Sequence, residues 1–387
     1  MNKVIVIVSG FFMMLILGAV YSYSVFRLSL EQVFSVSTTV SGLPYMVSLF
    51  FYALFVMFSG PYLRKYKVRY IAIIGALFVG LGWMISSMAD SILVFTLSYG
   101  VLIGTGVGIM YGIPLYLVSL YFPNRSGFYT GLVLLGFGLS PLISSPLGEY
   151  LIDSVGLFDT FLYLGLIFGS LLLLLTIFVK EKEGTVKSVQ KAKTKLFEDQ
   201  RFFLVYVLFV FGTMIGLMMI GLTYQVGVNS YGFTREEASF FLGLFAIMNG
   251  LGRPLFGYIT DVKKFVFSAS LINLLVLLVG VLGFLIDLSF IYVLVFSIFW
   301  MSLGAWLSIA PTVTKLYFGL EDYTSNYGII FTAYGVGAIL GTTLSGVLFD
   351  FFDGIKGVYL LVVLVSLTSI TLLVWQRKKL SKLDSLH

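Results

Sequence analysis

Long apolar runs alternate with short polar segments along the whole chain. A membrane-spanning α-helix needs about 20 predominantly apolar residues, and twelve runs reach that length. They cover residues 4–26, 40–62, 70–89, 92–120, 126–150, 157–179, 202–228, 236–259, 264–286, 289–317, 326–349 and 357–375. The first run continues through Val25 and Phe26 without a small-residue cleavage site, which favours a retained helix over a signal peptide. The pattern predicts an all-α membrane protein with twelve transmembrane helices.

Composition excludes several classes of protein. Of the 387 residues, 59% are hydrophobic and only 11% are charged, whereas soluble domains average about 25% charged residues. The chain has no cysteine, and its single histidine is the last residue, His387. No phosphate-binding loop or dinucleotide fingerprint is present. We therefore expect no metal site, no cofactor and no enzymatic activity.

The basic residues indicate how the helices cross the membrane. With the N-terminus inside, 20 of the 24 Lys and Arg residues fall on the inner side, and only Arg27, Arg235 and Lys356 fall outside. Cytoplasmic loops are enriched in Lys and Arg. This asymmetry predicts that both termini are cytoplasmic, in a plasma (inner) membrane. It also explains the formal charge of +6 without nucleic-acid binding.

The sequence divides into two similar halves. We expect a six-helix bundle over residues 1–179, a charged cytoplasmic linker over 180–201, a second bundle over 202–375 and a cytoplasmic tail over 376–387. Gly60 and Gly257 follow equivalent runs at an offset of 197 residues, and Pro114 and Pro311 share that offset. Internal repeats of this kind are typical of secondary transporters.

Arg253 is the one charged residue that the apolar runs place inside a span; every other charged residue falls in a predicted loop or at a helix end. A charge near the bilayer centre costs about 2.5–3.5 kcal/mol on the lenient insertion scale. Two explanations remain open. Arg253 could face lipid and extend toward the interface, or it could face a central cavity and bind a carboxylate brought by a substrate. We favour the second explanation.

Other polar groups near the bilayer centre are candidates for the same cavity. Asn249 lies one turn before Arg253 and offers an amide without charge. Tyr21, Tyr111, Trp306 and Tyr334 lie at comparable depths in other runs. Buried tyrosine and tryptophan need hydrogen-bond partners, so we expect these four aromatic side chains to form part of a substrate site.

Four segments resemble the major facilitator superfamily, and within it the oxalate/formate antiporters and monocarboxylate transporters. They are residues 18–26, 106–114 followed by 121–127, 249–257 and 326–335. The resemblance implies a twelve-helix, two-bundle fold. It also implies that Arg253 binds the substrate carboxylate and that Gly60, Arg64, Gly257 and Asp261 belong to loop motifs involved in conformational change.

The sequence departs from these relatives at three informative positions. Tyr334 stands where the oxalate/formate antiporters are expected to have a lysine, so a second cation for a second carboxylate is missing. Asn249 stands where animal monocarboxylate carriers are expected to have an aspartate. Arg64 replaces the acidic residue of the first loop motif, which Asp261 keeps in the second.

These observations predict a carrier that moves a small monocarboxylate, such as lactate, pyruvate, formate or acetate, by alternating access. Proton symport, uniport and anion exchange stay open, as do an oxalate/formate-type exchanger, a multidrug or neutral-solute exporter, and a receptor or scaffold without transport. The expected partners are a small organic anion, with or without a proton, and the lipid bilayer. We expect a monomer.

Overall fold

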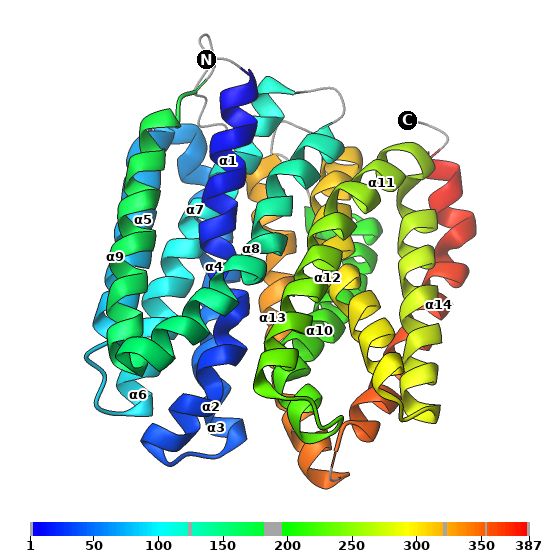
Figure 1. The fold of residues 1–387 in the computed structure, drawn as a ribbon. Helices are drawn as coiled ribbons and strands as arrows, with labels where there is room; N and C mark the ends of the chain where they lie inside the picture. Colours follow the sequence, from blue (N-terminus) through cyan, green and yellow to red (C-terminus); the bar gives the residue numbers. More distant parts are fainter. Residues whose placement is uncertain (1–2, 123–125, 182–195, 320–322, 353, 385–387) are drawn as a thin grey trace.

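The protein is almost entirely helical. The computed structural model describes residues 3–122, 126–181, 196–319, 323–352 and 354–384, and no β-strand occurs in these ranges (Figure 1). The α-helices are α1 (Lys3–Leu17), α2 (Tyr23–Phe34), α3 (Thr38–Ser41), α4 (Leu43–Lys65), α5 (Val68–Ser86), α6 (Ile92–Phe95), α7 (Gly104–Tyr121), α8 (Ser126–Val155), α9 (Leu157–Leu175), α10 (Gln200–Asn229), α11 (Arg235–Leu285), α12 (Ser289–Phe318), α13 (Tyr323–Phe351) and α14 (Lys356–Asp384). The other helical segments are the 3₁₀ turns η1 (Gly18–Ser22), η3 (Thr176–Phe178) and η4 (Leu196–Glu198), and the π-helical segment η2 (Thr96–Ile103).

Helix length and composition confirm an all-α membrane protein. Within the described ranges, eleven helical stretches are long and apolar enough to cross a bilayer, and one of them, Glu236–Leu285, has 50 residues. Its backbone is not helical at Lys264, where φ is 68° and ψ is 174°. The predicted twelve spans therefore require α11 to be divided at Lys264, where the sequence also divides its two apolar runs.

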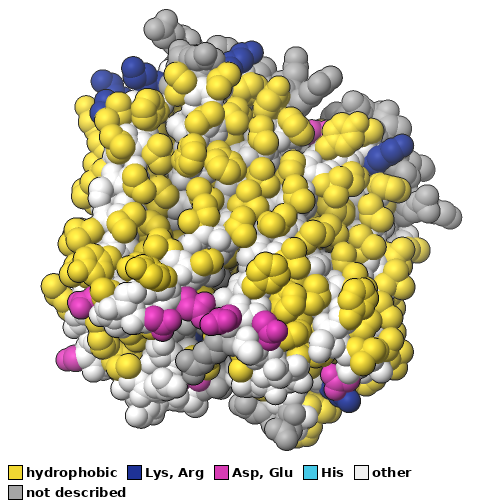
Figure 2. Space-filling view, viewed as in Figure 1, with side chains coloured by type: hydrophobic (Ala, Val, Ile, Leu, Met, Phe, Trp, Pro, Cys, Tyr) yellow, Lys and Arg dark blue, Asp and Glu magenta, His cyan; other side chains and the backbone are white. Residues whose placement is uncertain are grey.

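The beginning of α1 and the end of α14 lie at the same end of the bundle (Figure 1). We call this end the terminal face and the other end the opposite face. Figure 2 shows a broad hydrophobic surface between them, with most visible Lys and Arg near the terminal face and most visible Asp and Glu toward the opposite face. This distribution follows the charge asymmetry of the sequence.

The two halves of the chain pack closely near the terminal face. A Cβ atom on Gly60 of α4 would lie 2.6 Å from the carbonyl oxygen of Thr324 in α13, and one on Gly127 of α8 would lie 2.6 Å from Oδ2 of Asp261 in α11. Only glycine permits its backbone to come so close to the other half of the chain. The halves are therefore closed against each other on this side.

A cavity of about 230 Å³ separates the halves toward the opposite face. Residues of η1, α2 and the beginning of α4 line it from the N-terminal half, and the later parts of α10 and α13 line it from the C-terminal half. Tyr21 and Tyr45 lie on its wall. The cavity thus leads from the opposite face toward the middle of the bundle.

The structure corrects one expectation about charged residues. Arg27 and Glu31, expected outside the first span, lie inside α2 and belong to a single membrane-compatible stretch, Lys3–Phe34. Their side chains are only 13% and 19% exposed. Arg253 is therefore not the sole charged residue withdrawn from water in a span, because the helix runs two turns beyond the end of the apolar run.

Two predicted segments lie partly outside the described residues. Residues 182–195 of the predicted linker and 385–387 of the predicted tail lie outside the described part of the structure. Within the tail, the backbone of α14 stays helical through Asp384.

Candidate functional site

Arg253 lies at the centre of the candidate site. Its side chain is 0% exposed, which excludes the explanation that it faces lipid. Nη2 and Nε donate to Oδ1 of Asn249 at 3.1 and 3.3 Å, whereas Nη1 makes no hydrogen bond of normal geometry. No Asp or Glu of the described residues forms an ion pair with Arg253. The buried guanidinium therefore has an unused donor and no protein counter-ion.

Close packing of α8 against α11 positions this guanidinium. A Cβ on Gly131 of α8 would lie 2.7 Å from Cα of Pro254, and one on Gly138 would lie 2.6 Å from Cα of Gly250. The missing side chains let the two helices meet directly, and they bring the Phe137 ring to 5.3 Å from the Arg253 guanidinium carbon. Such a cation–π contact partly compensates for the lost hydration of the charge.

Asn249 fixes the orientation of Arg253. Its Oδ1 accepts both hydrogen bonds from the guanidinium, and its Nδ2 donates to the Trp300 carbonyl at 2.8 Å. Both ends of the amide are thus engaged within the protein. Pro254 lacks an N–H group and so leaves a helix carbonyl of the preceding turn without its usual donor.

Tyr21 and Tyr334 join the two halves of the chain beside Arg253. Their hydroxyl groups lie 2.9 Å apart and form a hydrogen bond between η1 and α13. The Tyr21 ring packs edge-on against Phe137 at 5.0 Å, and the Tyr21 hydroxyl lies within electrostatic reach of Arg253. The structure therefore brings together two residues chosen from the sequence.

Tyr111 belongs to the same cluster, together with tyrosines that the sequence reasoning did not single out. Its ring packs against Tyr52 at 5.1 Å and against Phe331 at 5.2 Å. Tyr111 and Tyr327 both lie within electrostatic reach of Arg253. The buried hydroxyls of Tyr52 and Tyr327 both lie against the Tyr111 hydroxyl, but none of the three makes a hydrogen bond of normal geometry to a described residue. Buried polar groups usually have well-formed partners, so these hydroxyls have capacity for a ligand.

Trp306 lies beside the aromatic cluster and not within it. Its ring lies 6.4 Å from the Phe209 ring, which in turn lies 6.1 Å from the Phe331 ring. The indole occupies space above Gly212, where a Cβ would lie 2.2 Å from it. Its Nε1 is buried without a hydrogen bond.

Four aromatic residues of the cluster were missed from the sequence: Tyr52, Phe137, Tyr327 and Phe331. Aromatic residues are so abundant in this chain, with 38 Phe and 24 Tyr, that helix packing explains most of them. A weak signal was available for Phe137, because it stands between Gly136 and Gly138. Small residues on both sides indicate a surface that approaches another helix.

The predicted loop-motif residues lie at the terminal face, away from Arg253. Gly60 contacts α13, and Gly257 contacts the Gly127 carbonyl of α8, where a Cβ would lie 2.8 Å away. Asp261 accepts a hydrogen bond from the backbone N–H of Phe128 near the beginning of α8. Arg64 lies in the last turn of α4, and its side chain is outside the described part of the structure.

Comparison with known proteins agrees with this architecture. The family model described as Major Facilitator Superfamily matches residues 5–316 and 214–386. The chain is 25% identical over 342 residues to an uncharacterized MFS-type transporter, YhjX of Escherichia coli, covering 84% of this chain and 82% of that protein. It is 25% identical over 343 residues to the oxalate:formate antiporter of Oxalobacter formigenes, covering 85% and 80%.

A vertebrate protein is similar at the same level. Identity to monocarboxylate transporter 4 of Gallus gallus is 24% over 306 residues, which cover 74% of this chain and 64% of that protein. The resemblance inferred from four segments is thus confirmed across most of the sequence. With helices throughout and a family match spanning nearly every residue, the chain belongs to the major facilitator superfamily and is an integral multi-pass membrane protein.

Proposed function

We propose that this transporter carries a small monocarboxylate by alternating access, with Arg253 as the group that binds the carboxylate. The observation that carries the proposal is a fully buried guanidinium with no protein counter-ion and one unused N–H donor. Two of the similar proteins are named for transport of carboxylates, namely an oxalate:formate antiporter and a monocarboxylate transporter.

The geometry supports a division of roles around the solute. Asn249 holds the guanidinium in place through its amide oxygen. Nη1 and the hydroxyls of Tyr52, Tyr111 and Tyr327, which make no hydrogen bond of normal geometry, supply donors on the side facing the aromatic cluster. Charge-assisted hydrogen bonds in a dry site are strong. The hydrogen bond between Tyr21 and Tyr334 joins the two halves, and it would break and re-form as the transporter opens and closes.

A single positive charge favours a single negative charge. No Lys, Arg or His of the described residues other than Arg253 lies in the aromatic cluster, and the position that would hold a second cation is Tyr334. A dicarboxylate would bring a second charge without a counter-ion, and desolvating it costs several kcal/mol. We therefore place lactate, pyruvate, formate and acetate ahead of oxalate.

We also propose that the terminal face is cytoplasmic in a plasma (inner) membrane. The concentration of Lys and Arg near that face supports this orientation. The cavity of about 230 Å³ would then lie on the outer side of the protein.

Uptake of labelled lactate, formate and acetate into proteoliposomes tests the proposal. We expect Arg253→Ala and Arg253→Lys to lose uptake, since a lysine cannot make two parallel hydrogen bonds to one carboxylate. Arg69→Lys is the matched control, because Arg69 is exposed at the beginning of α5, outside the aromatic cluster. Undiminished uptake by the Ala variant would refute the assignment. Stimulation by an inward proton gradient would identify symport, and stimulation only by preloaded carboxylate would identify exchange.

A further inference from the structure

A second arginine, largely but not fully buried, lies toward the opposite face, on the wall of the cavity. Arg27 of α2 is 13% exposed, and its Nε lies 3.6 Å from Oε1 of Glu31 one turn later. Nε also donates to Oγ of Ser41 at 3.0 Å. Arg27 and Gly221 both line the cavity between the two halves.

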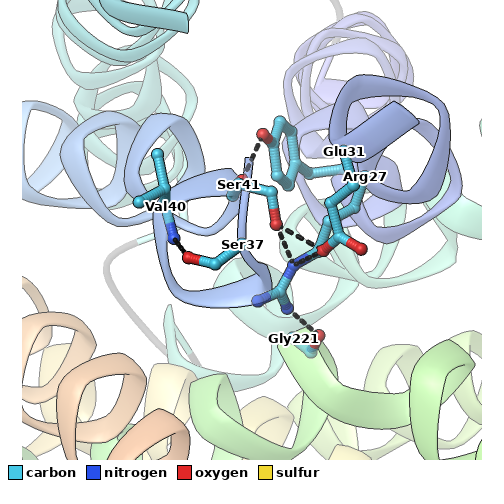
Figure 3. Close-up of polar contacts among 7 residues, drawn as sticks. Arg27, Glu31, Ser37, Val40, Ser41 and Gly221 are labelled. Atoms are coloured by element: carbon cyan, nitrogen blue, oxygen red, sulfur yellow. Dashed lines mark hydrogen bonds and ion pairs between the residues drawn. The ribbon is translucent and has the colours of Figure 1, made fainter. Parts of the chain in front are cut away.

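The Arg27 guanidinium bridges the two halves of the chain. Its Nη1 donates to the backbone carbonyl of Gly221 in α10 at 3.1 Å, and Figure 3 shows the side chain reaching from its own helix to this carbonyl. Gly221 presents no side chain in the way, since even a Cβ there would meet only the ring of Tyr45, at 3.7 Å. The contact joins segments 194 residues apart in the sequence.

The contacts of Arg27 within its own half hold it ready for this bridge. Ser41 Oγ accepts from Arg27 and donates to Oε1 of Glu31 at 2.6 Å, while the Ser41 carbonyl accepts from the Tyr23 hydroxyl at 2.6 Å. The short helix α3 is thereby tied to α2, and the guanidinium is fixed at one end. Its other end is bound to a backbone carbonyl, which any helix displacement will move.

We propose that Arg27 is a latch between the halves, whose hydrogen bond to the Gly221 carbonyl closes the opposite face and breaks each time that face opens. The proposal rests on transport by alternating access and does not depend on which solute is carried. To admit a solute to the cavity from the opposite face, α2 must separate from α10, and this separation breaks the Arg27–Gly221 bond. A backbone carbonyl as acceptor leaves Glu31 paired in both states, so opening exposes no unpaired charge.

Cysteine labelling measures the latch directly, because the natural chain has no cysteine. Ser345→Cys places a reporter on the cavity wall in α13, where the serine is 4% exposed. Thr312→Cys places a second reporter at the terminal face, beside Gly127 of the other half, at a position 5% exposed. The rate of maleimide labelling is measured in nanodiscs, where both faces are accessible.

The latch predicts that Arg27→Gln raises the labelling rate of the Ser345→Cys reporter about tenfold, the effect of losing one charge-assisted hydrogen bond, without raising that of Thr312→Cys. Arg27→Lys, which keeps the charge but has one nitrogen in place of three, should give a smaller rise. Lys356→Gln, an exposed cation near the same face, should change neither rate. An unchanged rate at Ser345→Cys, or an equal rise at both reporters as general loosening would produce, overturns the latch. If the native protein takes up no carboxylate but the labelling pattern is as predicted, the substrate proposal is refuted and the latch stands.

Discussion

Two arginines are withdrawn from water in this transporter, and their partners differ. Arg27 has an acidic neighbour one turn away, a serine hydroxyl and a carbonyl from the other half of the chain. Arg253 has one amide oxygen, an aromatic ring and no carboxylate among the described residues. A buried ion pair is complete within the protein, whereas an unpaired buried cation requires a counter-ion from elsewhere. The first arginine is therefore expected to serve structure and motion, and the second to serve binding.

The largest effect that separates the two regions is expected at Arg253. Arg253→Ala should weaken carboxylate binding by about 100-fold or more, because it removes a buried charged partner of the ligand. Arg27→Ala should change carboxylate affinity by only about threefold, since its guanidinium already has a counter-ion. Isothermal titration with lactate, formate and acetate measures both variants. Equal losses at the two positions would contradict the distinction between them.

Asn249→Asp gives Arg253 the kind of neighbour that Arg27 already has. An ionised carboxyl group one turn away would compete with the ligand for the guanidinium, so we expect carboxylate affinity to fall about tenfold near neutral pH. Isothermal titrations near neutral pH, with native protein and Asn249→Ser as references, measure this effect. Affinity in Asn249→Asp equal to that of the native protein would argue against direct competition at Arg253.

Tyr334→Lys adds a second cation to the region that has only one. We expect the ratio of oxalate to acetate uptake to rise about tenfold, because each carboxylate would then have a positively charged partner. Tyr334→Phe is the control, since it also breaks the 2.9 Å contact with Tyr21 but adds no charge. Uptake assays with both labelled solutes give the ratio. A ratio that stays at the native value in Tyr334→Lys would count against the one-charge explanation of selectivity.

The smallest effect is expected from Glu31→Gln, which leaves Arg27 without its carboxylate. The pair is partly exposed, at 13% and 19%, and pairs of this kind contribute about 1 kcal/mol. Thermal unfolding in detergent should therefore shift downward by a few degrees, with carboxylate affinity nearly unchanged. Glu236→Gln, at an exposed position, should not shift the transition. A large loss of carboxylate affinity in Glu31→Gln would mean that the Arg27 region also takes part in binding.

The sequence predicted the helical architecture well because the bilayer imposes one rule on every span. Apolar runs of sufficient length must form helices, and the observed spans follow these runs closely. The rule fails at the end of the first span, where α2 continues through Arg27 and Glu31. Each of these charges neutralises the other, and hydropathy alone does not register such pairing.

The candidate site was only partly predictable. Arg253 stood out because an isolated charge in an apolar run is rare, and Asn249 followed from helical spacing. Phe137 had only the weak signal of its flanking glycines and Tyr52 had none, since their places depend on how α8 and α4 pack against neighbours from other parts of the chain. Periodicity describes one helix at a time and carries no information on which helices meet.

The most direct test of the central claim compares a carboxylate with its neutral isostere. Acetate and acetamide have nearly the same shape, and only acetate can neutralise Arg253. Isothermal titration should detect binding of acetate to the native protein, no binding of acetamide, and no preference between them in Arg253→Gln. Equal binding of the two solutes by the native protein, or a preference for acetate that persists in Arg253→Gln, would contradict the assignment of Arg253 as the carboxylate-binding group.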